Sequence, residues 1–380
     1  MSDSMQKGGW QRILTLAANR PGTISALSSI LAIVFGLLFG FVIMLIANPG
    51  DAVPGFITIL LGWSQQGARS IGNTFYFATP IILTGLSVAF AFKTGLFNIG
   101  ATGQLTMGAF TAVYIGVNWG FLGPLHWVVA LLGAVAAGAV WGGIAGMLKA
   151  YRNVHEVVAT IMLNYVAMYM NSMLITQLIY NQQYARALSP ESSALIPRAG
   201  LNSIFVGSSI NAGILIAVVL AVVLYIVLDR TVRGYELKSV GFNRDAARYA
   251  GMNEKRNIVI SMTTAGAIAG LAGGIMFLVS GRHLEPVHQL MMEGFDGIAI
   301  ALLGLSHPIG VFFAGIFYGA LEQGGHYLQL YDFVPEIIDI IISVIIYFAA
   351  LSLFLQKFVA AYIRRRTGAE VEIREGSEIK

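Results

Sequence analysis

Amide side chains and glycines are concentrated in one short stretch in the first third of the chain. Residues 94–108 read T-G-L-F-N-I-G-A-T-G-Q-L-T-M-G, so that Asn98 and Gln104 stand among glycines at the start of an apolar segment. Amides donate and accept hydrogen bonds, and irregular backbone inside a membrane is tolerated where it is buried in protein or lines a cavity. The pattern predicts a broken helix that lines a path. A tight turn before an ordinary helix is the alternative.

Two further amides lie inside a later apolar segment. Asn164 falls about two turns into residues 156–176, and Asn171 follows seven residues later on the same face of the expected helix. An Asn inside a membrane span needs a hydrogen-bond partner. That partner is either a neighbouring helix, which is the favoured reading, or water and substrate in a cavity.

No catalytic or metal-binding motif accompanies these amides. The chain has no cysteine, which excludes disulfides, thiolate metal sites and Cys nucleophiles. No Gly is followed by Lys, so the G-x-x-x-x-G-K-[ST] loop that cradles nucleotide phosphates is missing from the sequence. His283 and His288 flank Glu285 in a short loop, where two unrelated histidines are favoured over a metal site. These features argue against an enzyme and against a metal cofactor.

The composition requires a membrane environment. The 380 residues are 56% hydrophobic and only 11% charged, whereas a soluble protein carries roughly 25% charged residues. Disordered chains are polar and rich in charge, so disorder is excluded as well. We therefore predict an all-α polytopic membrane protein, for which the net charge of +4 does not indicate a nucleic-acid partner.

About ten transmembrane helices are expected, because a helix needs roughly 20 apolar residues to cross the hydrocarbon core. Broken or re-entrant helices are expected near 94–108 and 297–310, where Ser306-His307-Pro308 interrupts the apolar pattern. Glycines one turn apart, such as Gly266 and Gly270, are expected to pack helices inside the chain. The predicted spans are 23–47, 75–92, 97–117, 125–148, 156–176, 212–228, 258–279, 297–305, 309–323 and 337–355.

The placement of basic residues predicts that both chain ends lie in the cytoplasm. With the N-terminus inside, 19 of the 23 Lys and Arg residues fall on the cytoplasmic side, as the positive-inside rule requires. The expected organisation is a cytoplasmic N-terminus at 1–22, a transmembrane domain at 23–356 and a charged cytoplasmic tail at 357–380. Within the domain, 178–211 forms an outer loop and 229–256 a cytoplasmic loop.

The cytoplasmic loop is expected to contain a short capped helix. Asn243 is a plausible N-cap and Gly251 a C-terminal stop. Between them, Ala246, Ala247 and Ala250 give the helix a small-residue face that suits docking into a partner's cleft. The spans themselves hold few ionisable groups: Glu322 is the one deep candidate, and Asp296 is expected to cap a helix. This scarcity disfavours a self-sufficient proton-coupled pump.

Four blocks of sequence resemble one family when they are taken together. F-N-I-G-A-T-G-Q-L-T-M-G-A at 97–109, N-V-H-E-V-V-A-T-I-M-L-N-Y at 153–165, G-Y-E-L-K-S-V-G-F-N-R-D-A-A-R-Y-A-G-M at 234–252 and G-F-D-G-I-A-I-A-L-L-G at 294–304 occur in order. The chain is similar to inner-membrane permease subunits of ATP-binding-cassette importers, in the branch for branched-chain amino acids, ribose and nucleosides. The resemblance covers about residues 75–355, and the first two blocks most resemble nucleoside permeases.

The resemblance implies a division of labour between subunits in a bacterial plasma or inner membrane. A binding lipoprotein delivers the nucleoside, two permease subunits alternate access, and separate ATPase subunits bind and hydrolyse ATP, so that this chain carries no cofactor. The second permease is expected to be a different but related chain. The loop residues Gly241, Asn243, Ala246, Ala247 and Gly251 are expected to couple to the ATPase.

A nucleoside offers a flat ring for stacking and several hydrogen-bond groups, which aromatic rings and amides match. On this ground the candidate substrate path comprises Phe97, Asn98, Gln104, Asn164 and Tyr165. The same machinery could move a simple sugar or a branched-chain amino acid. A self-contained secondary carrier or channel is the alternative from a different class.

Overall fold

The computed structural model describes residues 21–331, 333, 334, 336–351, 355, 357–359 and 361. Their regular secondary structure is helical apart from one two-stranded hairpin, as the all-α expectation requires. Most of the two predicted cytoplasmic ends, 1–22 and 357–380, lie outside the described residues. The chain divides into two compact units, Met1–Ile57 with Leu328–Lys380, and Thr58–Tyr327, and each is described by itself.

The first unit contains helices from both ends of the chain. Helix α2 (Pro21–Ala47) packs against α15 (Glu336–Ala350), and most of α3 (Ala52–Leu61) belongs to the same unit. The rings of Phe35 and Phe39 lie 6.1 and 6.4 Å from that of Phe348. Helix α3 was not among the predicted spans, because its apolar run is too short to cross a bilayer.

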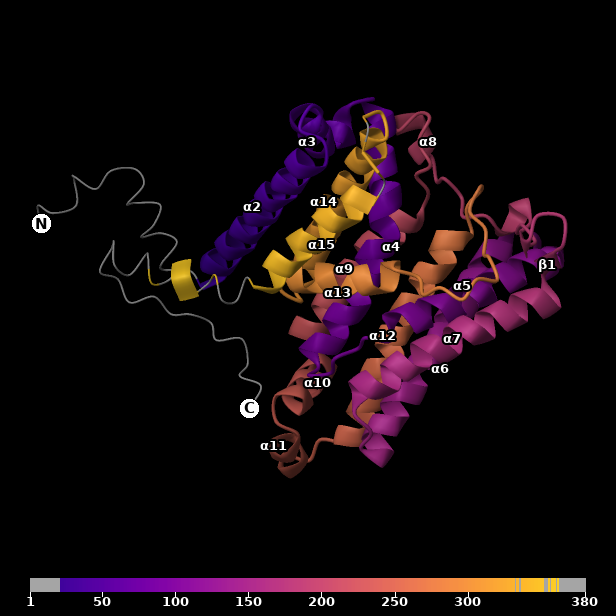
Figure 1. Cartoon of the computed structure of the whole chain (residues 1–380). Helices are drawn as coiled ribbons and strands as arrows, with labels where there is room; N and C mark the ends of the chain where they lie inside the picture. Colours follow the sequence, from indigo (N-terminus) through magenta and orange to yellow (C-terminus); the bar gives the residue numbers. More distant parts are fainter. Residues whose placement is uncertain are drawn as a thin grey trace, which may run out of the picture. The chain divides into compact units, whose positions relative to one another are not determined.

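The second unit is a bundle that carries the regions singled out in the sequence (Figure 1). A hairpin of β1 (Tyr180–Asn181) and β2 (Arg186–Ala187) and the single turn of α8 (Leu201–Ile204) lie in its longest loop. The other helices of this unit are α4 (Ala68–Lys93), α5 (Ala101–Asn118), α6 (His126–Arg152), α7 (Glu156–Leu178), α9 (Gly213–Arg230), α10 (Val232–Phe242), α11 (Arg244–Tyr249), α12 (Glu254–Phe277), α13 (Glu293–Leu303) and α14 (Pro308–Leu328).

Within the described residues, six helices are long and apolar enough to span a membrane: α2, α4, α6, α7, α9 and α12. Helix α5 does not meet that standard, although it was expected as a span. It contacts α4, α6, α7 and α12, and most of its residues are buried. Because protein rather than lipid surrounds α5, it can carry Thr102, Gln104 and Thr106 without exposing them to hydrocarbon.

Glycines allow α12 to pack closely into the centre of the second unit. A methyl group added at Gly138 or Gly142 of α6 would overlap backbone atoms of Gly266 or Met262 in α12. A methyl group added at Gly270 of α12 would likewise overlap the backbone of α6, at the Ala134 carbonyl oxygen. In lipid, small residues promote association because they let helix backbones approach. The prediction that these glycines pack helices inside the chain is confirmed.

Polar contacts close the two ends of this bundle. Lys149, at the end of α6, places its Nζ 2.5 Å from Oε2 of Glu156 at the start of α7, with both side chains mostly buried. The 178–211 loop lies at the end of the unit away from α11 (Figure 1). The buried ring of His126 helps to hold it: Nδ1 lies 2.8 Å from Ser193 Oγ, and Nε2 lies 2.9 Å from the Ile115 carbonyl.

Adjacent glycines of α6 provide a matched test of this packing. Gly142→Ala is expected to lower the free energy of unfolding by about 1–3 kcal/mol, because the new methyl group overlaps backbone that cannot move aside. Gly143→Ala is the control: its nearest neighbour is the Thr263 hydroxyl at 3.0 Å, so its effect is expected to stay within about 1 kcal/mol. Thermal unfolding in detergent measures both variants, and equal losses would contradict the packing.

Candidate functional site

The α4–α5 connection is a built turn. Gly95 has a positive φ of 74°, its N–H donates to the Phe92 carbonyl, and the Leu96 N–H donates to the Ala91 carbonyl. This pair of bonds is a Schellman motif, which ends a helix and brings a hydrophobic residue beyond the turn back onto the last helical turn. Ala91 and Leu96 are both fully or almost fully buried. The predicted break near 94–108 therefore lies at residues 94–100.

An amide network stabilises the rest of this connection. The Asn98 side chain donates from Nδ2 to Gln104 Oε1 at 3.0 Å, and its Oδ1 accepts from the Gly100 N–H at 3.0 Å and from Gln104 Nε2 at 3.2 Å. Both side chains are at most 1% exposed. The two amides thus satisfy one another and hold the start of α5.

Asn164 joins α7 to the same connection. Its Oδ1 accepts from the Gly103 N–H at 2.9 Å, and its Nδ2 donates to the Ile99 carbonyl at 3.0 Å. The side chain is 1% exposed. The favoured reading, an interhelical partner for this Asn, is the one that the structure bears out. Asn171 differs, since its buried Oδ1 has no hydrogen-bond partner among the described residues.

The predicted substrate-path residues thus divide into two kinds. Asn98, Gln104 and Asn164 are buried and bonded within the network, whereas Phe97 and Tyr165 are 42% and 46% exposed. The Phe97 ring stacks on Phe92 with its centroid 4.9 Å away. The network links the backbone near Phe97 to the residue before Tyr165, so it positions two accessible aromatic rings.

A charged group that the sequence analysis largely missed lies at the start of α13. Arg282 Nη2 lies 2.5 Å from Glu293 Oε1, and the Tyr318 hydroxyl donates to Asp296 Oδ2 at 2.9 Å. Asp296 was expected to cap a helix, but α13 begins at Glu293 and this carboxylate binds Tyr318 of α14 instead. The spacing of Glu293 and Asp296, which places them on one helix face, was the available signal.

This charged group lies close to the start of α5. Gly294 packs so closely on Thr102 that an added methyl group would overlap it. The Thr102 hydroxyl is buried and has no hydrogen-bond partner among the described residues. Helix α13 also packs along α4, where Gly297 meets Thr84. The acidic end of α13 and the amide network therefore border the same end of α5.

The cytoplasmic loop contains the expected capped helix, α11. Asn243 Oδ1 accepts from the Ala246 N–H at 2.9 Å, and Gly251 has a positive φ of 84°. The N–H groups of Gly251 and Met252 donate to the carbonyls of Arg248 and Ala247, which is a second Schellman motif. Both predicted caps are confirmed. Ala246 is exposed and Ala247 is buried. The small residues of α11 therefore do not form one exposed face.

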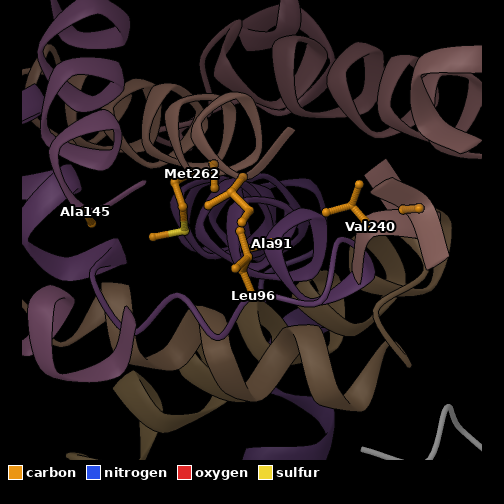
Figure 2. Close-up of a cluster of buried hydrophobic side chains, with 8 residues drawn as sticks. Ala91, Leu96, Ala145, Val240 and Met262 are labelled. Atoms are coloured by element: carbon orange, nitrogen blue, oxygen red, sulfur yellow. The ribbon is translucent and has the colours of Figure 1, made fainter. Parts of the chain in front are cut away.

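Both Schellman motifs contribute to one hydrophobic cluster (Figure 2). Ala91 and Leu96 enter it from the α4–α5 turn, and Val240 and Ala247 enter it from α10 and α11. Ala145 of α6 and Ile258, Met262 and Ala265 of α12 complete the buried set, with Met252 packed against it. Val240 and Ala247 thus anchor the loop helices to the bundle, while most of α11 stays exposed.

Two glycines bring the loop directly against the α4–α5 turn. A methyl group added at Gly95 would overlap Gly241 of α10, and one added at Gly241 would lie 2.5 Å from the Thr94 carbonyl carbon. The Thr94 hydroxyl is also hydrogen-bonded to that of Ser261 in α12. A displacement of α10 therefore acts on the turn without an intervening side chain.

In the described part of the chain, which includes the histidine loop, no group of three or more His, Cys, Asp or Glu side chains is placed to hold a metal ion. Burial lowers the pKa of His283, and the nearby Arg186 lowers it further despite Glu285. Its Nδ1 lies 3.4 Å from Ser189 Oγ, and the His288 ring lies 5.0 Å from that of Tyr169. These contacts give each histidine a structural neighbour of its own.

Residues 70–350 match the family described as branched-chain amino acid transport system / permease component. The chain is 39% identical to the guanosine ABC transporter permease protein NupP of Bacillus subtilis over 89% of its length and 96% of that relative. It is 33% identical to the nucleoside ABC transporter permease protein NupB of Lactococcus lactis, over 88% and 93%. It is 34% identical to the glucose ABC transporter permease protein TsgB13 of Haloferax volcanii, over 74% and 76%.

A second permease with the same named substrate also matches the chain in two of these organisms, namely NupQ in Bacillus subtilis and NupC in Lactococcus lactis. No solved structure matches the chain.

Two Asn residues on one face of α7 test the network. Asn164→Ala is expected to lower the free energy of unfolding by about 2–4 kcal/mol, because it leaves the buried Gly103 N–H and Ile99 carbonyl unpaired. Asn171→Ala removes the same atoms from a side chain whose oxygen is unbonded, so its cost is expected to stay near 1 kcal/mol. Thermal unfolding of both variants measures the difference, and equal losses would mean that the Asn164 bonds contribute nothing.

Proposed function

Because this chain belongs to the family of branched-chain amino acid transport system permease components, we propose that it is the transmembrane permease subunit of an ATP-binding-cassette importer for nucleosides. The observation that carries this proposal is similarity over about nine tenths of the chain to permeases named for guanosine and nucleosides. The chain is a multi-pass protein of the plasma membrane, as the family and the six apolar helices require. Energy then comes from ATP bound by a partner ATPase, with no cofactor in this chain.

The proposed topology has about ten transmembrane helices and both ends in the cytoplasm. It is supported by the concentration of basic residues in 229–256 and in the two terminal segments. In this arrangement the transmembrane domain extends over 23–356, and 178–211 faces the outside. The segments 1–22 and 357–380 are the cytoplasmic ends.

The proposed path passes the two accessible aromatic rings, Phe97 and Tyr165. Stacking of a base on an aromatic ring contributes about 1–3 kcal/mol. Asn98, Gln104 and Asn164 belong to the path as its supporting wall, since their hydrogen bonds are internal in this conformation. Asp296 and Tyr318 supply hydrogen-bonding groups near the start of α5, where ribose hydroxyls would find acceptors.

The proposed partners follow from the loop and from the relatives. Paired permeases in two organisms support a heterodimer with a second, related permease. The exposed surface of α11 and the adjoining Phe242, 79% exposed, suits an ATPase cleft. In that role Asn243 and Gly251 cap α11, Ala246 meets the ATPase, and Gly241 and Ala247 anchor the helices to the bundle. A binding lipoprotein would deliver the nucleoside to the outer loops, where Arg186 and Arg198 could contact acidic residues of the lipoprotein.

The decisive experiment is uptake into liposomes by the full chain, reconstituted with its ATPase, second permease and binding lipoprotein. Labelled guanosine is expected to enter only with ATP, and unlabelled nucleosides are expected to compete. In the same assay Phe97→Ala is expected to raise KM about tenfold through the lost stacking. Phe121→Ala, which alters an 81% exposed ring elsewhere, should leave KM unchanged.

Two results would overturn the assignment. Uptake by this chain without an ATPase would indicate a secondary carrier or channel. Competition by glucose with no effect of nucleosides would favour the sugar alternative, which the similarity to the glucose permease supports. Loss of all uptake when ATP is withheld, together with nucleoside competition, excludes both.

The coupling role of α11 has a separate test. Ala246→Arg is expected to reduce ATPase association at least tenfold, because it places a bulky charge on the exposed face of α11. Asn202→Arg adds the same charge to an exposed residue of α8, at the other end of the unit, and should leave association intact. Co-purification of the ATPase measures both variants. An unchanged Ala246→Arg complex would contradict docking at this face.

A further inference from the structure

A cleft of about 550 Å³ lies between α9 and α12 in the second unit. Val223 and Leu224 of α9 and Ile260 and Ala267 of α12 contribute to its apolar walls, and Phe90 of α4 also lines it. Its volume falls in the range of roughly 300–1,000 Å³ that is typical of small-molecule sites. The cleft exists because α9 packs on α4 and α10 while α12 packs on α4, α5 and α6. Helices α9 and α12 are thus held apart.

The cleft borders an exposed apolar surface of α9, one of the helices that are long and apolar enough to span a membrane. Val219, Val223 and Ile226 of α9 are 62%, 44% and 47% exposed, and Val223 also lines the cleft. On α12 the lining residues extend from Arg256 to Leu271, about 22 Å at 1.5 Å per residue. That length exceeds the roughly 15 Å of one half of the hydrocarbon core. An acyl chain of one leaflet therefore fits along it.

One end of the cleft is basic and rich in hydrogen-bond donors. Arg233 of α10 and Arg256 of α12 line this end, together with Asn257. Arg256 is exposed and forms no ion pair with any described residue, whereas Arg233 lies 3.3 Å from Glu236. Asn257 is only 4% exposed, and it also lines this end of the cleft. Guanidinium groups bind phosphate through paired hydrogen bonds.

We propose that this cleft binds an anionic phospholipid. The acyl chain lies between α9 and α12, and the phosphate of the head group is bound by Arg233 and Arg256, with the Asn257 amide as a further donor. Basic pockets between transmembrane helices recognise anionic head groups in this way. The lipid site does not involve the transported substrate, so its test is independent of the proposed function.

The volume of the cleft argues against a helix from a partner subunit as the occupant. A helix about 10 Å in diameter would occupy roughly 1,700 Å³ along 22 Å, which is more than the cleft can enclose. A lipid chain is thinner, and its negative head group complements the two arginines.

The test uses the full chain purified with its co-purifying subunits, with bound phosphatidylglycerol and phosphatidylcholine counted by native mass spectrometry. We expect preferential retention of phosphatidylglycerol. The double variant Arg233→Gln/Arg256→Gln is expected to lose about 30-fold in affinity for it, since two basic groups near the surface are removed. Arg152→Gln/Arg230→Gln removes the same charge from exposed positions on the predicted cytoplasmic side, outside both the cleft lining and α11, and should change affinity less than twofold.

A second variant tests the acyl-chain slot. Ala267→Phe fills the apolar part and is expected to lower phosphatidylglycerol retention at least fivefold with both arginines intact. Equal losses in the two arginine pairs would reduce the effect to general surface charge and overturn the site. A photo-crosslinker at position 267 that captures a second permease in place of lipid would overturn it too. The arginine pairs decide the question even if Ala267→Phe fails to fold.

Discussion

The bundle of residues 58–327 depends on close backbone contact at glycine. Lipid tails are as apolar as leucine side chains, so helices in a membrane gain little from burying one another and associate through tight packing and hydrogen bonds. Gly138, Gly142, Gly266 and Gly270 supply that packing where α6 meets α12. Once α12 is placed, α5 is enclosed among α4, α6 and α7. Enclosure is what permits α5 to carry Thr102 and Gln104 at membrane depth.

The same kind of contact joins the proposed ATPase face to the proposed path. Gly95 and Gly241 touch through their backbones, and the Schellman motifs on either side send Leu96 and Ala247 into one cluster. A side chain between the two segments could absorb a shift by changing rotamer, whereas two glycines cannot. Motion of α10 and α11 on ATPase closure would therefore reach the α4–α5 turn, where Asn98 and Gln104 begin the amide network.

Local signals in the sequence predicted the features governed by neighbouring residues. The two ends of α11 could be predicted from Asn243 and Gly251, because capping depends on side chains and φ values within one turn. The break after Lys93 could be predicted from Gly95 for the same reason. Contacts between distant segments were beyond such signals. Nothing in the sequence near Asp296 indicates that Tyr318, 22 residues later, donates a hydrogen bond to its carboxylate. In the same way, the run of small residues in α11 does not indicate that Ala247 is buried. Helix α5 falls outside the six most apolar helices because a test of apolar length treats every helix as facing lipid.

The internal bonding of the amides constrains how a nucleoside could pass. Asn98 and Gln104 hydrogen-bond to each other, and Asn164 hydrogen-bonds to the backbone of Gly103 and Ile99. Direct binding of substrate by these amides would therefore first require breaking buried hydrogen bonds. Phe97 and Tyr165 require no such exchange, since they are already accessible. Recognition by ring stacking, with the amides fixing the backbone beneath the rings, is therefore the less costly arrangement. The path would then open by a movement of the turn at Gly95, which is also the point where Gly241 of α10 contacts the α4–α5 connection.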